Sequence, residues 1–195
     1  MSHHIYHTRG IILSSSATGE SNRFYKIFTE ELGLIGAHAQ SVRIEKSKLR
    51  FVLQDFSVVT LDLVRGKEMW RIVSAGASKP LDDIKKSPAQ LTLLARYFTF
   101  LARLLQGEGR DQELFDEILR VVDFLEKSVV SNSLTPAFEG LTTLRVLVHL
   151  GYMDPFDYEI FLDSSDYKTA TLTEFEKIRP RALLKIVSAM NASHL

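Results

Sequence analysis

The stretch Phe24-Tyr-Lys-Ile-Phe-Thr29, followed by Glu30-Glu-Leu-Gly33 and then Leu34-Ile-Gly-Ala37, decides the fold class of this chain. Two short runs of aromatic and aliphatic residues are joined here by a turn that closes on glycine, which is the pattern of a β-hairpin. A helical interpretation of residues 24–32 stays open, because short apolar runs do not distinguish the two periods. We expect a β-rich domain around this hairpin.

Further short runs of aromatic and aliphatic residues lie before and after this hairpin in the sequence. Between two later runs, Arg65-Gly-Lys-Glu68 provides the turn of a second hairpin. Five short strands is the count of an OB-type barrel, so an OB fold is expected for residues 1–79. The expected strands, each bounded by turn-type residues, cover 10–14, 24–29, 34–42, 56–65 and 69–74.

After Gly76-Ala-Ser-Lys-Pro80 the apolar residues change to helical spacing. Proline near the first turn and glycine after the last one mark the ends of these helices. The sequence therefore predicts an α+β protein, with a five-stranded OB-fold barrel in residues 1–79 and a helical domain in residues 80–195. The expected helices run from Ser87-Pro88 to a stop at Gly107, through 114–129, from Thr135-Pro136 to a stop at Gly151, and onward from Pro180.

Composition limits the possible functions of the 195 residues. The 45% hydrophobic content argues against disorder, and the absence of cysteine excludes disulfides, thiol catalysis and thiolate zinc sites. No apolar run is long enough to span a membrane, and the N-terminal residues lack the order of a signal peptide. We therefore expect a cytoplasmic protein with no membrane partner.

Charge is distributed unevenly although the formal net charge is zero. Residues 1–79 hold 11 Lys and Arg against 7 Asp and Glu, whereas residues 80–195 hold 13 against 17. The strand-rich half is thus the basic one, and a partner of negative charge would be expected to bind there.

Motifs that support catalysis or metal binding are missing. The chain has no phosphate-binding glycine motif, no GxSxG elbow and no HExxH. His3, His4 and His7 cluster at the amino terminus, which is a poor scaffold for a metal site. The acidic residues from Asp154 to Asp166 do not match the spacing of a calcium-binding EF-hand loop and are expected to be a solvated segment. We expect no catalytic residue, no metal and no cofactor, so the protein is not predicted to be an enzyme.

The clearest functional pattern is the basic run Arg43-Ile-Glu-Lys-Ser-Lys-Leu-Arg50. If this run is extended, Lys46, Lys48 and Arg50 point to one face, while Leu49 and Phe51 point to the other. One face of the barrel would then be cationic, as a phosphate-binding surface requires.

Cations also flank aromatic residues elsewhere in the strand-rich half. Arg65, Lys67 and Arg71 surround Trp70, and an earlier strand places Arg23 and Lys26 beside Phe24 and Tyr25. This combination suits single-stranded nucleic acid, because the charges follow the phosphates while the rings stack on bases. The alternative is that Phe24, Phe51 and Trp70 fill the barrel and the charges only solvate it.

Several spaced motifs resemble one known family. They are Gly10-Ile-Ile-Leu13, Gly19-Glu-Ser-Asn-Arg23, 27–35, 46–50, Leu53-Gln-Asp-Phe-Ser57, Leu61-Asp-Leu-Val-Arg-Gly66, 113–119 and 144–152. In this order they resemble the RecO family of bacterial recombination mediators, most strongly from about residue 10 to residue 74.

The resemblance implies an OB-fold with a helical domain that binds single-stranded DNA, with duplex DNA as an open possibility. It also implies annealing of complementary strands and work with a RecR-like protein and a single-strand DNA-binding protein to load a recombinase. On the same basis, the expected phosphate contacts are Arg43, Lys46, Lys48 and Arg50, and further nucleic-acid contacts are expected from Arg65, Lys67, Trp70 and Arg71.

The chain departs from the family at one place, and two other functions stay open. Many members carry a four-cysteine zinc segment after the stretch that matches Leu150-Gly-Tyr152, where this chain continues with Met153-Asp-Pro and no cysteine. The chain thus resembles a compact, zinc-free form. One alternative is an adaptor whose helical domain docks repair proteins while the barrel has lost its affinity for DNA. The other is an RNA-directed OB protein.

Overall fold

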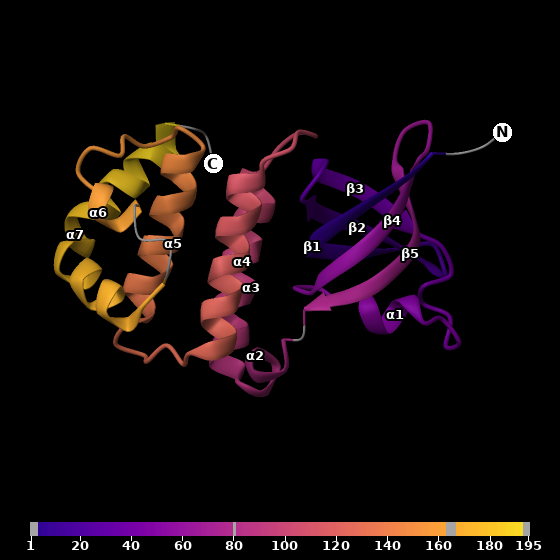
Figure 1. The fold of residues 1–195 in the computed structure, drawn as a ribbon, viewed down its shortest axis with the longest axis horizontal. Helices are drawn as coiled ribbons and strands as arrows, with labels where there is room; N and C mark the ends of the chain where they lie inside the picture. The colour runs from indigo at the N-terminus through magenta and orange to yellow at the C-terminus, as the bar shows by residue number, and fades with distance from the viewer. Residues whose placement is uncertain (1–3, 80, 163–166, 193–195) are drawn as a thin grey trace. The chain divides into compact units, whose positions relative to one another are not determined.

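The computed structural model describes residues 4–79, 81–162 and 167–192. Its first half is a closed barrel with the strand order β1-β2-β3-β5-β4 (Figure 1). This confirms the expected five-stranded OB-type barrel followed by helices. The strands are β1 (Ile5–Thr18), β2 (Asn22–Thr29), β3 (Gly33–Ala39), β4 (Val58–Arg65) and β5 (Trp70–Lys79), with the short helix α1 (Leu49–Val52) between β3 and β4.

Both predicted hairpins are present. The strands β2 and β3 pair antiparallel with Ile27 opposite Ile35, which excludes the helical interpretation of residues 24–32. The strands β4 and β5 also pair antiparallel. A parallel contact, in which Ala37 and His38 of β3 face Trp70 and Arg71 of β5, closes the cylinder.

Gly33 is required at the first hairpin. Its φ of 68° lies in the left-handed region. A Cβ atom at this position would lie 2.2 Å from the carbonyl oxygen of Gly109. Gly109 follows the helix α3 (Pro88–Leu104) in sequence and lies against the hairpin turn. Its amide donates a hydrogen bond to the carbonyl of Leu32 at 3.1 Å. The hairpin tip therefore tolerates only glycine.

Alternation along the strands fills the barrel. The core cluster includes Tyr25 and Ile27 of β2, which are fully buried, and Trp70 of β5, which is 5% exposed. Residues Val42 and Leu53, on either side of the basic run, also belong to this cluster. Apolar side chains thus anchor both ends of the segment that links β3 to β4.

Residues 43–50 are not extended, so the condition under which their cations would alternate with Leu49 and Phe51 is not met. Ser41 adopts a φ of 54°, which ends the extended chain after β3, and residues 41–46 form turns before α1 begins at Leu49. The spacing of Leu49 and Leu53 is helical rather than alternating, and both side chains pack toward the barrel core. The burial of these two leucines decides the local conformation.

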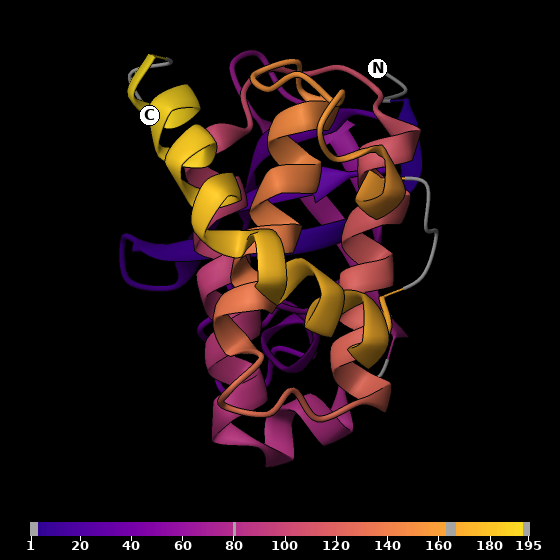
Figure 2. The ribbon, with the colours of Figure 1, turned by 90° about the vertical axis from the view of Figure 1, so that its left-hand side faces the viewer.

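The helices of the second half are α2 (Asp82–Lys86), α3 (Pro88–Leu104), α4 (Gln112–Lys127), α5 (Thr135–His149), α6 (Glu159–Leu162) and α7 (Thr169–Ala192). The predicted start of α3 is confirmed, and the Ser87 hydroxyl accepts the amide of Gln90 at 3.4 Å. Helix α7 packs along α5 (Figure 2). The expected start after Pro180 is wrong, because α7 begins at Thr169 and contains this proline in its interior.

The chain divides into two compact units. The barrel unit comprises residues 1–81 and 98–115, and the helical unit comprises residues 82–97 and 116–195. Within the barrel unit, Phe115 packs on Phe28 and Phe98 packs on Phe56, so the segment 98–115 covers part of the barrel's outer surface. Two domains with a boundary after Lys79 remain a prediction.

Candidate nucleic-acid interface

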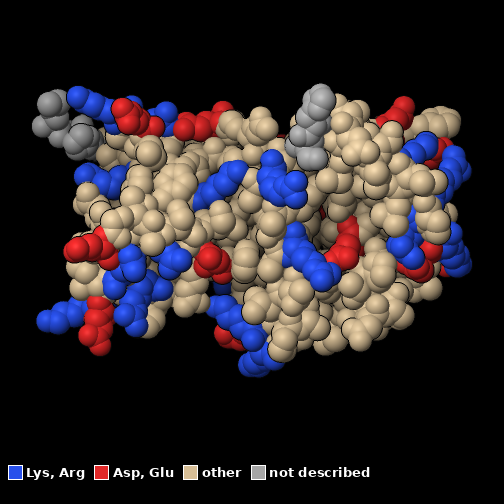
Figure 3. Space-filling model, turned by 180° about the vertical axis from the view of Figure 1, so that it is seen from behind, with Lys and Arg blue, Asp and Glu red and all other residues tan. Residues whose placement is uncertain are grey.

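Four cations of the basic run lie together at the α1 end of the barrel. The side chains of Arg43, Lys46, Lys48 and Arg50 are all exposed. Among the residues that the structure describes, none of the four takes part in an ion pair. Figure 3 shows Lys and Arg side chains gathered over the lower part of the barrel unit. We refer to these four cations with Phe51 as the α1-end surface.

Phe51 provides an aromatic face on this surface. Its side chain is 65% exposed, and the guanidinium carbon of Arg50 lies 4.8 Å from the ring centre. An exposed ring beside a guanidinium is the arrangement on which unpaired bases stack. The alternative in which Phe51 fills the barrel is therefore wrong for this residue.

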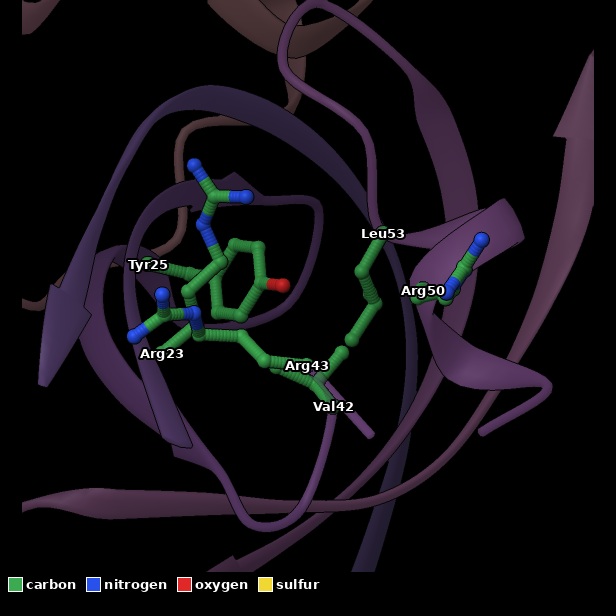
Figure 4. Close-up of a pocket in the computed structure, with 6 residues that line it drawn as sticks. All are labelled: Arg23, Tyr25, Val42, Arg43, Arg50 and Leu53. Atoms are coloured by element: carbon green, nitrogen blue, oxygen red, sulfur yellow. The ribbon is translucent and has the colours of Figure 1, made fainter. Parts of the chain in front are cut away.

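A cavity of about 300 Å³ opens beside the α1-end surface. It is lined by Arg23, Tyr25, Val42, Arg43, Arg50 and Leu53 (Figure 4). Figure 4 shows the hydroxyl of Tyr25 pointing toward the side closed by Leu53, with Arg50 beyond it. Three arginines therefore line one hollow at the barrel mouth, although the guanidinium group of Arg50 points away from Tyr25 (Figure 4).

Strand alternation creates this cavity. Arg23 and Tyr25 have the same parity in β2 as the fully buried Ile27, so they share the inward-facing register toward the mouth of the barrel. The residues opposite them on the two neighbouring strands are small, which leaves space above the Tyr25 ring. These partners are Ser15 and Ala17 of β1 and Ala37 and Ala39 of β3.

Two polar atoms of this cavity are buried without a hydrogen-bond partner. They are the Tyr25 hydroxyl and the Nε of Arg23. Burial raises the pKa of Tyr25, while the nearby Arg23 lowers it and the carboxylate of Asp55 raises it further. Asp55 itself accepts a 2.5 Å hydrogen bond from the Ser15 hydroxyl. The phenol is thus a neutral donor at pH 7 beside cationic groups.

Arg43 is partly held in place by the chain around it. Its Nη1 donates to the carbonyl of Gly19 at 3.0 Å, and its backbone amide donates to the carbonyl of Ser21 at 3.0 Å. These bonds link the β1–β2 loop to the basic run. The guanidinium keeps further N–H donors for a ligand.

The second group of predicted contacts lies in a different environment. Trp70 is buried, and its Nε1 donates to Glu108 at 3.1 Å. Arg65 binds the same carboxylate at 2.6 Å and lies 4.8 Å from the centre of the Trp70 ring. These contacts hold the Trp70 ring in the barrel wall, where it has no free face for a base, and they neutralise Arg65.

Arg71 and Lys67 remain exposed near this position. Arg71 lies opposite His38 in the parallel β3–β5 contact, and both residues line a second cavity of about 290 Å³. Lys26, by contrast, donates to the carbonyl of Ala102 within the barrel unit. The structure therefore places the predicted cations in two groups, and the α1-end surface is the one free of acidic partners.

The other candidate ligands of the sequence are engaged elsewhere. The Nδ1 of His7 lies 2.6 Å from the carboxylate of Asp62, and the ring of His4 packs edge-on against Tyr6. His3, Asp163 and Asp166 lie outside the described residues. Within the described ranges, no group of three His, Asp or Glu residues could hold a metal ion.

The sequence groups Arg23 and Lys26 with Phe24 and Tyr25 as cations beside aromatic rings, but Arg23 and Tyr25 are not among the expected contacts. The signal that could have found them is the alternation Arg23-x-Tyr25-x-Ile27, which puts all three on one face of the strand. Small residues at the facing positions are visible in the sequence, but their register becomes known only when the strands pair.

Comparison with known proteins agrees with this fold. Residues 1–80 match the family model described as "Recombination protein O N terminal". Proteins named "DNA repair protein RecO" are similar over a longer stretch. The one from Rubrobacter xylanophilus is 28% identical over 153 residues, which are 78% of this chain and 60% of that protein. The one from Dehalococcoides mccartyi (strain ATCC BAA-2266 / KCTC 15142 / 195) is 31% identical over 137 residues, which are 70% and 54%.

The fold defines the chain as an OB-fold protein with an added helical unit. Residues 1–80 thus match the N-terminal domain of the RecO family, and the similarity to proteins named RecO extends over most of the chain. The aligned regions span between 54% and 60% of the length of these two relatives. No helix in the described part of the chain is long and apolar enough to cross a membrane.

Proposed function

We propose that this protein is a DNA-binding factor of recombinational DNA repair and that its barrel binds single-stranded DNA through the α1-end surface. The observation that carries the proposal is the group of four unpaired, exposed cations around Phe51 on an OB barrel. Four phosphate contacts and one stacked base fit this arrangement. The names of the similar proteins support a repair role.

Strand annealing follows from the same surface without catalysis. Two strands repel each other through their phosphates, and a cationic surface that holds both lowers this repulsion. No covalent bond is made or broken in this process. On the family resemblance we extend the proposal to loading of a recombinase, with a RecR-like protein and a single-strand DNA-binding protein as partners and with cytoplasmic location.

The experiment is fluorescence anisotropy of a labelled single-stranded oligonucleotide, titrated with the protein from about 50 to 200 mM salt. We expect affinity that falls linearly with salt on a logarithmic scale, with a slope of about 0.7 per phosphate contact. RNA of the same sequence, added as a competitor, separates a DNA-directed protein from an RNA-directed one. Absence of binding at the lowest salt would overturn the proposal.

A second candidate function is an adaptor that docks repair proteins with little DNA binding. One observation in the helical unit favours it. Phe156 and Ile160 are 80% and 76% exposed, and Leu184 of α7 is 75% exposed. Asp157, which lies between Phe156 and Ile160, links this segment to α7 by binding Arg181 and Lys185. Direct binding of a purified RecR-like or single-strand DNA-binding protein, together with absent DNA binding, would favour the adaptor.

A further inference from the structure

The cavity at the barrel mouth has the chemistry of a site for one phosphate group. Tyr25 is fully buried, and its hydroxyl lacks a partner, as does the buried Nε of Arg23. A buried donor without an acceptor is destabilising, so natural proteins keep such groups mainly where a ligand or water satisfies them. The two residues that carry these donors line the same cavity.

The charge of the cavity fits an anion with more than one negative charge. Three arginines, Arg23, Arg43 and Arg50, line it, and the guanidinium groups of Arg23 and Arg43 lie on the same side as Tyr25 (Figure 4). The carboxylate that acts on Tyr25 belongs to Asp55, and it already accepts the Ser15 hydroxyl. Guanidinium N–H groups are oriented to bind pairs of phosphate oxygens. An internal phosphodiester carries one charge, whereas a phosphate monoester carries about 1.5 to 2 at pH 7.

The buried position of the Tyr25 hydroxyl and the Arg23 Nε favours a phosphate at the end of a DNA strand over one in its middle. An internal phosphate has a sugar on each side and can present only two free oxygens to a surface. A terminal monoester has three free oxygens and can enter a cavity end-on. The atoms that lack partners are buried, so their ligand has to enter rather than lie across the rim.

We propose that the cavity formed by Arg23, Tyr25, Arg43 and Arg50 binds the terminal phosphate monoester of a DNA strand. The proposal rests on the proposed function, because it assumes that DNA reaches the α1-end surface next to the cavity. It assigns a role to Arg23 and Tyr25, and it predicts that the protein distinguishes strands by the chemistry of their ends.

The test compares three labelled oligonucleotides of one sequence in the anisotropy assay: one with a 5′-phosphate, one with a 3′-phosphate and one with hydroxyls at both ends. We expect at least one phosphorylated strand to bind about five- to tenfold more tightly than the hydroxyl strand, since hydrogen bonds to charged groups are the stronger ones. The end that gains affinity identifies the polarity of the bound strand. The preference should shrink below about pH 6, where the monoester loses its second charge.

Variants separate this site from the general DNA surface. Tyr25→Phe removes only the hydroxyl, and Arg23→Gln removes one guanidinium. Both should weaken binding of the phosphorylated strand more than binding of the hydroxyl strand, and so reduce the preference for the phosphorylated end. The matched control is Tyr158→Phe, which removes another buried hydroxyl without a partner, in the helical unit. This control should keep the preference.

The possible failures are distinguishable. If all three strands bind the wild-type protein equally and with the same salt dependence, the terminal-phosphate site is wrong and the proposed function stands. If no strand binds at any salt concentration, the proposed function fails and the site fails with it. If Tyr25→Phe and Tyr158→Phe change the preference equally, the cavity is not the origin of the preference.

Discussion

The guanidinium carbon of Arg145 lies 4.4 Å from the centre of the Tyr167 ring inside the helical unit. Arg145 is 5% exposed, binds Glu117 at 3.3 Å and donates from its Nε to the carbonyl of Phe161 at 2.8 Å. The Tyr167 hydroxyl donates to the same glutamate at 2.5 Å. One buried cation thus connects α4, α5, α6 and the residue Tyr167 that precedes α7.

This network predicts the effect of removing its cation. Arg145→Met leaves the carboxylate of Glu117 and a buried carbonyl without this partner, and such losses destabilise by about 3–5 kcal/mol. Urea unfolding followed by far-ultraviolet circular dichroism measures the change. The control is Arg120→Met, because Arg120 binds the same Glu117 at 2.8 Å but is 40% exposed, and exposed pairs contribute about 0–1 kcal/mol. Equal losses in the two variants would contradict a structural role for the buried pair.

The two aromatic residues of the barrel that sequence reasoning grouped together should respond in opposite ways. Phe51→Ala removes an exposed ring and should weaken DNA binding by about 1–3 kcal/mol while leaving the melting temperature unchanged. Trp70→Phe removes a buried indole with its bond to Glu108 and should lower the melting temperature while leaving DNA affinity unchanged. Weaker DNA binding by Trp70→Phe and unchanged DNA binding by Phe51→Ala would indicate that Trp70, not Phe51, contacts a base.

Gly33 gives a prediction about backbone strain. Gly33→Ala should destabilise the barrel by more than the roughly 1–3 kcal/mol of an unfavourable φ, because its Cβ would also meet the backbone of Gly109. Gly107→Ala is the control, since Gly107 has a φ of 79° but no atom within 4 Å of the added carbon. Unfolding is followed through the fluorescence of Trp70, which is the only tryptophan in the chain. Similar losses in both variants would show that the close approach to Gly109 is unimportant.

Two carboxylates predict how barrel stability depends on pH. Hydrogen bonds from Arg9 lower the pKa of Glu30, and hydrogen bonds from Arg65 lower the pKa of Glu108, each from an ordinary value of 4.5. A group with a lowered pKa in the folded state contributes stability above its unfolded pKa, and this stability is lost as the pH falls through the folded pKa. The free energy of unfolding should therefore decrease below pH 4.5.

The double variant Glu30→Gln, Glu108→Gln tests this dependence. Its unfolding free energy, measured in urea through Trp70 fluorescence, should be lower than that of the wild-type protein at pH 7. The difference in unfolding free energy between the two proteins should become smaller as the pH is lowered below 4.5, because the wild-type carboxylates become protonated. A difference that is constant between pH 7 and pH 3 would mean that these two carboxylates do not carry the dependence.

Local patterns predicted most of the barrel. The hairpins around Gly33 and Gly66 are set by turn residues and strand-forming runs close in sequence, so they could be recognised before the structure was known. The conformation of 43–50 could not, because it depends on Leu49 and Leu53 finding the barrel core. The position of Pro180 was misread for a similar reason. Packing of α7 on α5 maintains a helix across a residue that interrupts its hydrogen bonding.

The candidate site was predictable in part. Arg43, Lys46, Lys48 and Arg50 stand out in the sequence as a basic run, and the structure leaves all four exposed. The neutralisation of Arg65 depends on Glu108, which is 43 residues away in sequence and cannot be paired with it by pattern. The cavity next to Tyr25 likewise depends on strand register.

The measurement that tests the central claim most directly is oligonucleotide binding by a triple variant across a salt series. The variant combines Lys46→Ala, Lys48→Ala and Arg50→Ala, and the quantity compared is the slope of log affinity against log salt concentration. The triple variant should bind single-stranded DNA more weakly, and its slope should be smaller by about 2, since each phosphate contact contributes about 0.7. The matched control replaces three exposed lysines of the helices, Lys85, Lys127 and Lys177, by alanine, which changes the net charge equally. If both triple variants keep the wild-type affinity and slope, or lose them equally, the α1-end surface is not the DNA-binding site.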